Sequence, residues 1–164
     1  MSNYNYVYET VVQQFSQNLV ALKTLLNKAK THADYNQFDV NKFLDYKLAP
    51  DMFSFCRQVQ IVTDTAKGAA SRLAGKEIPA YADDEKTMDE LVARVDKTIN
   101  YLEGFKAEDF KNFESQKISF SYYPGKYLEG KSYFQSHATP NFFFHLTATY
   151  AILRNAVVNV GKKD

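Results

Sequence analysis

Four apolar stripes with helical spacing constrain this chain more than any other feature of its sequence. In the first stripe, apolar residues recur at steps of three and four between Tyr4 and Lys30, the spacing of one face of an α-helix. Similar stripes run over 50–75, 87–104 and 139–158. Four helices of this length, each with one face to bury, favour an antiparallel four-helix bundle.

Three of these helices have recognisable start signals. Pro50 suits a first helical turn, because its missing N–H would have no helical partner there. Thr87 and Glu90 have the spacing of a capping box, and Thr139 followed by Pro140 looks like a cap before a first-turn proline. We therefore expect helices to begin at these three places.

The connection between the third and fourth helices has a different pattern. Ile118, Phe120 and Tyr122 alternate with serines, which is the period of a β-strand. Pro124-Gly125 is typical of a turn, and the aromatic segment Tyr127–Phe134 is expected to return as a second strand. The sequence thus predicts an all-α antiparallel bundle, with a short β-hairpin inserted between helices 3 and 4.

Two charged features have ordinary explanations. The acidic run Asp83-Asp84-Glu85 lies in a loop over 76–86 and is expected to be solvated. Asp64 and Lys67 are three residues apart on one helix, so we expect them to form an ion pair.

Length and charge narrow the class of protein. The 164 residues, 45% of them apolar, suit a single domain over 1–164. The net charge is +1 and the basic residues are scattered, which argues against nucleic-acid binding. The sequence has no apolar run of the roughly 18 residues that a membrane span needs, and Met1–Tyr8 does not resemble a signal peptide. Its single cysteine, Cys56, excludes an intramolecular disulfide. From these features together we expect a cytoplasmic protein.

The fourth helix carries the strongest candidate for a functional side chain. His145 lies in the aromatic segment Phe142–Leu146, where it is expected to be partly buried. Asn141 and Thr149 lie one turn before and after it, so three polar groups share one helical face. Such a face needs partners, either on a facing helix or in a ligand pocket where His145 acts as a base or a metal ligand.

The residues expected to face this polar ladder lie on the second helix. Gln58 and Gln60 are the candidates, although either one could be an ordinary flanking residue. His137 could reach the same end of the bundle, but its spacing from His145 is poor for a shared metal. The predicted pocket therefore comprises Asn141, His145, Thr149, Gln58, Gln60 and His137.

Several segments taken together resemble one bacterial family. They are Leu48–Met52, Arg57–Gln60, Ala66–Ala70, His137–His145, Tyr150–Arg154 and Gly161-Lys162. The family is called domain of unknown function 1993 and is grouped with the DinB/YfiT-like proteins, a superfamily regarded as metalloenzymes. The resemblance spans nearly the whole chain and implies a four-helix bundle of up-down-up-down character that often assembles as a homodimer.

The resemblance also implies a metal site that this chain reproduces only in part. The superfamily typically holds nickel or zinc with three histidines, one on helix 2 and two as His-x-x-x-His on helix 4. His145 matches the second histidine of that pair, whereas Asn141 replaces the first, and Gln58 or Gln60 lies near the third position. Amide oxygens are weak ligands for these metals, so we expect no bound metal and a polar cavity in its place.

Three hypotheses for function remain open at the level of sequence. The first is metal-free binding of a small polar or aromatic ligand in a cavity floored by His145 and Asn141. The second is a structural or interaction homodimer in which the aromatic hairpin, Ile118–Phe134, covers the dimer seam. The third is a divalent-metal-dependent hydrolase or thiol transferase, with His145 as the candidate catalytic residue and further ligands from His137, Asp51 or a partner subunit.

Overall fold

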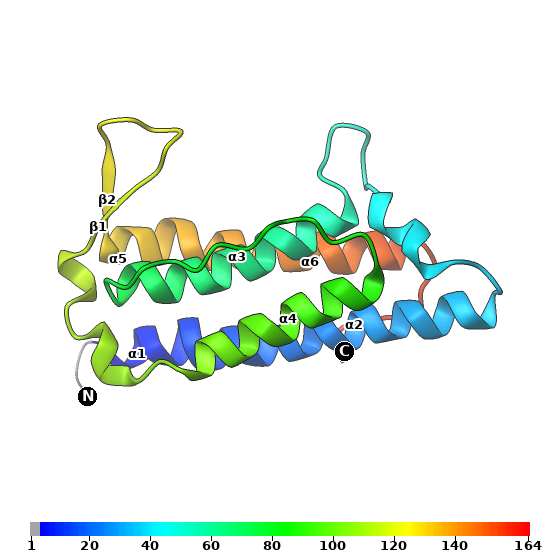
Figure 1. Cartoon of the computed structure of the whole chain (residues 1–164), viewed down its shortest axis with the longest axis horizontal. Coiled ribbons are helices and arrows are strands. Elements are labelled where there is room, and N and C mark those ends of the chain that lie inside the picture. The colour runs from blue at the N-terminus through cyan, green and yellow to red at the C-terminus, as the bar shows by residue number, and fades with distance from the viewer. Residues whose placement is uncertain (1–3) are drawn as a thin grey trace.

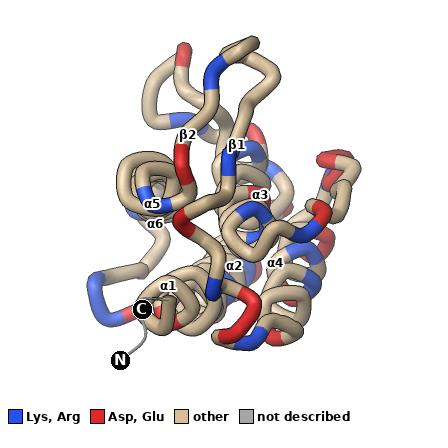
Figure 2. Tube along the Cα trace, turned by 90° about the vertical axis from the view of Figure 1, so that its left-hand side faces the viewer, with Lys and Arg blue, Asp and Glu red and all other residues tan. Residues whose placement is uncertain are grey.

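The computed structural model describes residues 4–164 as a bundle of four long helices with a small hairpin at one end (Figure 1). Viewed along their axes, the long helices form four neighbouring columns (Figure 2). The first three residues of Met1–Tyr8 lie outside the described residues. The first column is α1 (Asn5–Tyr8), η1 (Glu9–Gln14) and α2 (Phe15–Tyr35), the second is α3 (Phe55–Leu73), the third is α4 (Met88–Glu103), and the fourth is α5 (Gly130–Tyr133), η5 (Phe134–Ala138) and α6 (Thr139–Asn155).

The expected hairpin is present between the third and fourth columns, and it is shorter than expected. Strands β1 (Lys117–Ser119) and β2 (Tyr127–Glu129) pair antiparallel, with Ile118 opposite Leu128. The remainder of the aromatic segment, from residue 130 onward, is helical instead of extended. Short 3₁₀ turns fill the other connections: η2 (Val40–Asp45), η3 (Ala107–Phe110) and η4 (Phe113–Ser115).

Helices α3 and α4 run in the same direction, unlike the alternating directions that we expected. Thr63 on α3 contacts Arg94 on α4, and further along the same two helices Ser71 contacts Tyr101. The parallel arrangement is possible because the segment 76–86 carries the chain back along α3 before α4 begins (Figure 1). We call this segment the strap.

Aromatic side chains hold the long helices together. Phe15 on α2 stacks on Phe142 of α6 with ring centroids 3.9 Å apart and planes 8° from parallel. Both rings are fully buried, and burial of one such side chain contributes roughly 1.5–3 kcal/mol. The first and fourth columns are therefore fixed side by side.

The start of α3 differs from the prediction. The helix begins at Phe55, and Ser54 is its cap, accepting a hydrogen bond from the Arg57 amide at 3.4 Å. Pro50 and Asp51 lie in a turn before it. A hydroxyl that can accept from the first-turn N–H groups is a stronger start signal than a proline that is only tolerated there.

The capping box at the start of α4 is confirmed. Thr87 accepts a hydrogen bond from the Glu90 amide at 3.2 Å, and the Glu90 carboxylate accepts one from the Thr87 amide at 2.9 Å.

The fourth column begins at Gly130, so the prediction that it starts at Thr139 is wrong. Thr139 lies inside a continuous helix, and the π-helical segment Phe134–Ala138 comes directly before Thr139 and Pro140. A proline in a regular α-helix removes one hydrogen bond and clashes with the carbonyl four residues earlier. The wider π-turn removes that conflict and lets the helix continue.

None of the helices within residues 4–164 combines the length and the apolar character that a membrane crossing requires.

Candidate functional site

The centre of the candidate site is a hydrogen bond between α6 and α3. Nδ1 of His145 lies 2.6 Å from Oε1 of Gln58, and only 8% of His145 is exposed. The amide nitrogen of Gln58 donates to the Phe53 carbonyl at 3.3 Å, which fixes the amide with its oxygen toward the ring. An amide oxygen can only accept, so Nδ1 of His145 carries the proton and Nε2 keeps its lone pair.

Asn141 lies one turn before His145 on the same seam. Its amide nitrogen donates to Oγ1 of Thr65 on α3 at 2.9 Å. Thr149, one turn beyond His145, donates to the His145 carbonyl at 2.9 Å and is thus satisfied within its own helix. We call Gln58, Thr65, Asn141 and His145 the seam cluster.

The environment of His145 keeps its imidazole neutral. Burial lowers the pKa of His145 below the ordinary value for histidine, and the nearby positive charge of Arg57 lowers it further. At neutral pH the ring therefore presents a donor at Nδ1, used by Gln58, and an acceptor at Nε2. No residue within 4–164 donates a hydrogen bond to that Nε2 atom.

Two residues of the predicted pocket lie elsewhere. Gln60 donates to Oε2 of Glu85 in the strap at 2.8 Å. His137 lies two turns before His145 and packs against other rings, with Phe120 at 4.7 Å and Tyr133 at 5.5 Å between centroids. The structure thus brings together Gln58, Asn141 and His145, and it separates Gln60 and His137 from them.

A charged network between α3, α4 and the strap was not predicted from the sequence. At its centre is Arg94, which is 4% exposed. Its guanidinium contacts Asp64 at 2.8 Å, Asp83 at 2.7 Å and Glu85 at 2.9 Å, and its Nε donates to Thr63 at 2.7 Å. We call these residues the Arg94 network.

The network overturns the expectation that the acidic run is simply solvated. Asp83 binds Arg57 at 2.7 Å as well as Arg94, and Glu85 is held by Arg94 and Gln60. Burial alone would raise the pKa of both carboxyl groups, but hydrogen bonds and charge from the arginines outweigh it and lower both pKa values. The strap is therefore fastened to the bundle by ionised carboxylates.

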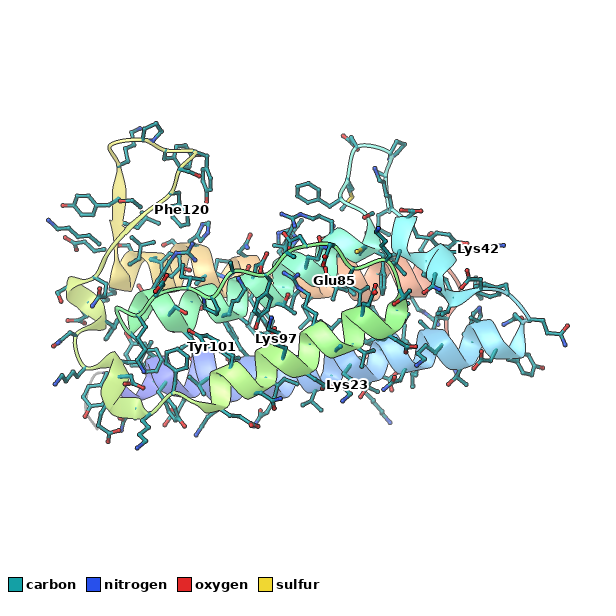
Figure 3. All side chains as sticks on the ribbon, in the orientation of Figure 1. Lys23, Lys42, Glu85, Lys97, Tyr101 and Phe120 are labelled. Carbon is teal, nitrogen blue, oxygen red and sulfur yellow. The ribbon has the colours of Figure 1, made fainter. Side chains whose placement is uncertain are left out.

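The expected Asp64–Lys67 ion pair is confirmed at 2.9 Å. The same lysine lies over the ring of Tyr81 in the strap, 4.5 Å from its centroid. Lys97 of α4, which Figure 3 labels, lies 4.2 Å from the centroid of that ring. These contacts further secure the strap over the groove between α3 and α4.

The residues of the seam cluster do not fit a nickel or zinc site. Gln58 occupies the Nδ1 side of His145, so a metal at Nε2 could not take the same amide oxygen as a ligand. Within residues 4–164, no group of three or more His, Cys, Asp or Glu side chains is close enough to hold a metal ion. The other sequence candidates lie apart, since His137 packs on the hairpin side and Asp51 is exposed in a turn.

A crystal structure described as a DinB family member protein from Shewanella denitrificans is similar to this chain. The two are 41% identical and superpose with a TM-score of 0.94, over 98% of this chain and 91% of the other. Together with the helical fold, this similarity defines a helical bundle protein of the DinB class.

The sequence also matches the family described as Domain of unknown function (DUF1993) over residues 7–164, and the chain belongs to that family. None of the curated proteins compared with the chain matches it.

Proposed function

We propose that this protein is a metal-free member of the DinB class that binds a small polar ligand at the seam between α3 and α6. The observation that carries the proposal is the 2.6 Å contact between Gln58 and His145. It fixes the proton on Nδ1 and leaves the lone pair of Nε2 available. A ligand suited to that atom donates an O–H or N–H group, as an alcohol, an amide or an amine does.

The donor chemistry argues against the alternative of a metal-dependent hydrolase or thiol transferase. Such an enzyme needs several strong donors around one point, and two of the three matching positions here hold amides that bond to the protein instead. In the absence of a metal, Nε2 of His145 would serve as a hydrogen-bond acceptor for a ligand. Amides at positions where the superfamily has histidine ligands, within a seam that is still polar, support binding without metal chemistry.

A fragment screen tests the proposal. Small alcohols, primary amides and amines would be screened by saturation-transfer NMR at about 5 mM, the range expected for weak fragments. We expect some of them to bind the wild-type protein and to lose binding in His145→Asn. The asparagine amide can still donate to Gln58, so this variant removes Nε2 with little other change.

His32→Asn is the matched control, because His32 lies on α2 and packs against Phe38 with ring centroids 6.0 Å apart. Binding should be unchanged in this variant. Fragments that bind equally well to His145→Asn, or a screen without any hit, would contradict the proposed function.

We also propose that the chain forms a homodimer through the outer face of α6. A hollow of about 470 Å³ there has no charged residue in its lining. It is lined by Leu48, Met52, Pro140, Phe143, Phe144, Thr147, Ala148 and Ala151. Phe144 is 60% exposed at the hollow, so the face offers both a projecting ring and a recess. A two-fold dimer needs such self-complementarity, which supports a second copy of this chain as the occupant.

The hairpin tyrosines Tyr122, Tyr123 and Tyr127 are exposed, but they line a hollow of their own chain. The other end of the expected seam, Phe134, lies in η5 and not in the hairpin. Phe134 is only 7% exposed and packs against Tyr6 of its own chain, with 5.6 Å between ring centroids.

Light scattering coupled to size exclusion should give a dimer for wild type and a monomer for Phe144→Ser. Tyr35→Ser, at an exposed aromatic on α2, should remain dimeric. Equal masses for the two variants would contradict the proposed face.

We further propose that residues 1–164 form one domain that acts in the cytoplasm. Cys56 is half-buried and free, and burial raises its thiol pKa. An unreactive single thiol suits a reducing compartment.

A further inference from the structure

A hollow of about 590 Å³ lies between the hairpin loop and the π-helical segment η5. Its wall consists of Phe120, Tyr122, Tyr123, Lys126, Tyr127, Leu128 and His137. Four of these are aromatic rings from the hairpin, and none is a carboxylate. Figure 3 labels Phe120 at the foot of the hairpin loop, where the loop leans over the helices. The volume is within the range of small-molecule sites.

Arg72, near the end of α3, brings an unbalanced positive charge to this place. Its guanidinium carbon is 5.5 Å from the Phe120 ring and 5.8 Å from the Tyr133 ring. Its Nη1 donates to the Tyr133 hydroxyl at 3.3 Å. Whereas Arg94 contacts three carboxylates, Arg72 forms no ion pair with any residue in 4–164.

The position of Arg72 depends on Gly68, one turn earlier on α3. A Cβ atom at position 68 would clash with Nη1 of Arg72, so the guanidinium folds back over the bare glycine. A glycine inside a helix costs about 1 kcal/mol relative to alanine. Here that cost lets a partly buried cation lie against Phe120, one of the rings in the wall of the hollow.

We propose that this hollow binds a small aromatic anion, with its ring between the tyrosines of the hairpin and its anionic group toward Lys126 and Arg72. Aromatic walls favour a flat apolar ring through stacked and edge-to-face contacts. A partly desolvated arginine without a carboxylate partner favours an anion. An aromatic cage can also hold a cation, but two positive side chains and no acidic one oppose that here.

This site is separate from the seam cluster, and it stands whether or not His145 binds a ligand. It goes beyond the proposed function because its ligand is charged and aromatic, and because its residues come from the hairpin, η5 and the end of α3.

Calorimetric titration with three related probes tests the ligand class. We expect 2-naphthoate and 1-naphthyl phosphate to bind the wild-type protein, and neutral 2-naphthamide to bind about tenfold more weakly or not at all. The two anions separate a carboxylate from a phosphate as the preferred group, and binding of either one supports the proposal. Equal affinity for the amide, or failure of both anions to bind at about 5 mM, would overturn it.

Two variants on the hairpin surface locate the site with little risk to folding. Tyr123 is 59% exposed and lines the hollow, and Lys126 is an exposed lining cation. Tyr123→Ala and Lys126→Glu should each weaken binding of the anion about three- to tenfold. Their matched controls are Tyr35→Ala and Lys42→Glu, since both of these residues are exposed. Lys42 lies far from the hairpin (Figure 3), and Tyr35 is the last residue of α2, which ends away from the hairpin (Figure 1).

The controls should leave the affinity unchanged. Loss of binding in the controls to the same extent, or unchanged affinity in both hairpin variants, would show that the anion binds elsewhere and would refute the site.

Discussion

At the scale of single residues, the central contact is the hydrogen bond that Nδ1 of His145 donates to the amide oxygen of Gln58. The spacing of Asn141, His145 and Thr149 predicted one polar face, and Gln58 was one of two candidates on the facing helix. The choice between Gln58 and Gln60 could not be made from the sequence, because it depends on the rotation of α3 against α6. The pairing of Arg94 was missed for a similar reason, since its partners Asp64 and Asp83 are distant in sequence.

The lowered pKa of His145 makes a prediction about stability and pH. Burial and Arg57 favour the neutral imidazole in the folded state, so the unfolded chain binds more protons as the pH falls through the ordinary histidine pKa. Stability is then fully present above that pKa and decreases below it. Burial gives His137 a contribution of the same sign.

Urea unfolding at about pH 8 and about pH 5.5 measures this effect. The wild-type protein should be less stable at the lower pH, and the difference should become smaller in His145→Asn. A wild-type protein that is more stable at about pH 5.5, or an unchanged difference in the variant, would contradict the assignment of a neutral buried imidazole.

At the scale of elements, the strap depends on Arg94. Removal of this side chain leaves Asp64, Asp83 and Glu85 without their shared counter-charge. Arg94→Met should therefore cost about 2–3 kcal/mol, a value reduced from that of a fully buried pair because Asp64 and Asp83 are partly exposed. Arg154→Met, at an exposed position on α6, should change the free energy of unfolding by less than about 0.5 kcal/mol. Equal stabilities of these two variants in urea would show that the strap is held by other contacts.

The start of the fourth column makes a second prediction at this scale. A Cβ atom on Gly130 would overlap the carbonyl oxygen of Phe113, and backbone cannot move aside as a flexible side chain can. Gly130→Ala should destabilise the protein by about 2 kcal/mol or more. Gly161→Ala meets no atom within 4 Å and is the matched control, with little expected change. Thermal unfolding of the two variants side by side compares them, and a stable Gly130→Ala protein would refute the close approach.

The ends of the elements show what the sequence could predict and what it could not. The capping box at Thr87 was predicted correctly because all of its hydrogen bonds are local. Thr139-Pro140 has an equally local signal but lies inside a helix, since the preceding π-turn accommodates the proline. A sequence signal for a helix start therefore gives a wrong prediction where the backbone before it is already helical, as it is in the π-helical segment before Thr139 and Pro140.

At the scale of the whole molecule, the four apolar stripes correctly predicted a helical bundle, and the alternating residues after the third helix correctly predicted the inserted hairpin. The alternating helix directions that we expected do not hold for α3 and α4, because the strap carries the chain back along the length of α3 before α4 begins. That path of the chain places α3 against both α4 and α6. One side of α3 thus contacts the Arg94 network, and another side contributes to the seam cluster. As a result, Gln60 bonds to Glu85 in the strap, whereas Gln58 bonds to His145 on α6.

The central claim is that this member of the DinB class binds no metal at the seam cluster. Elemental analysis tests it most directly, on untagged protein purified without chelators and dialysed against nickel, zinc and manganese in turn. Because an imidazole and two amides are a weak donor set, the account predicts well under about a tenth of a metal ion per chain. Close to one metal ion per chain, lost in His145→Ala, would contradict it.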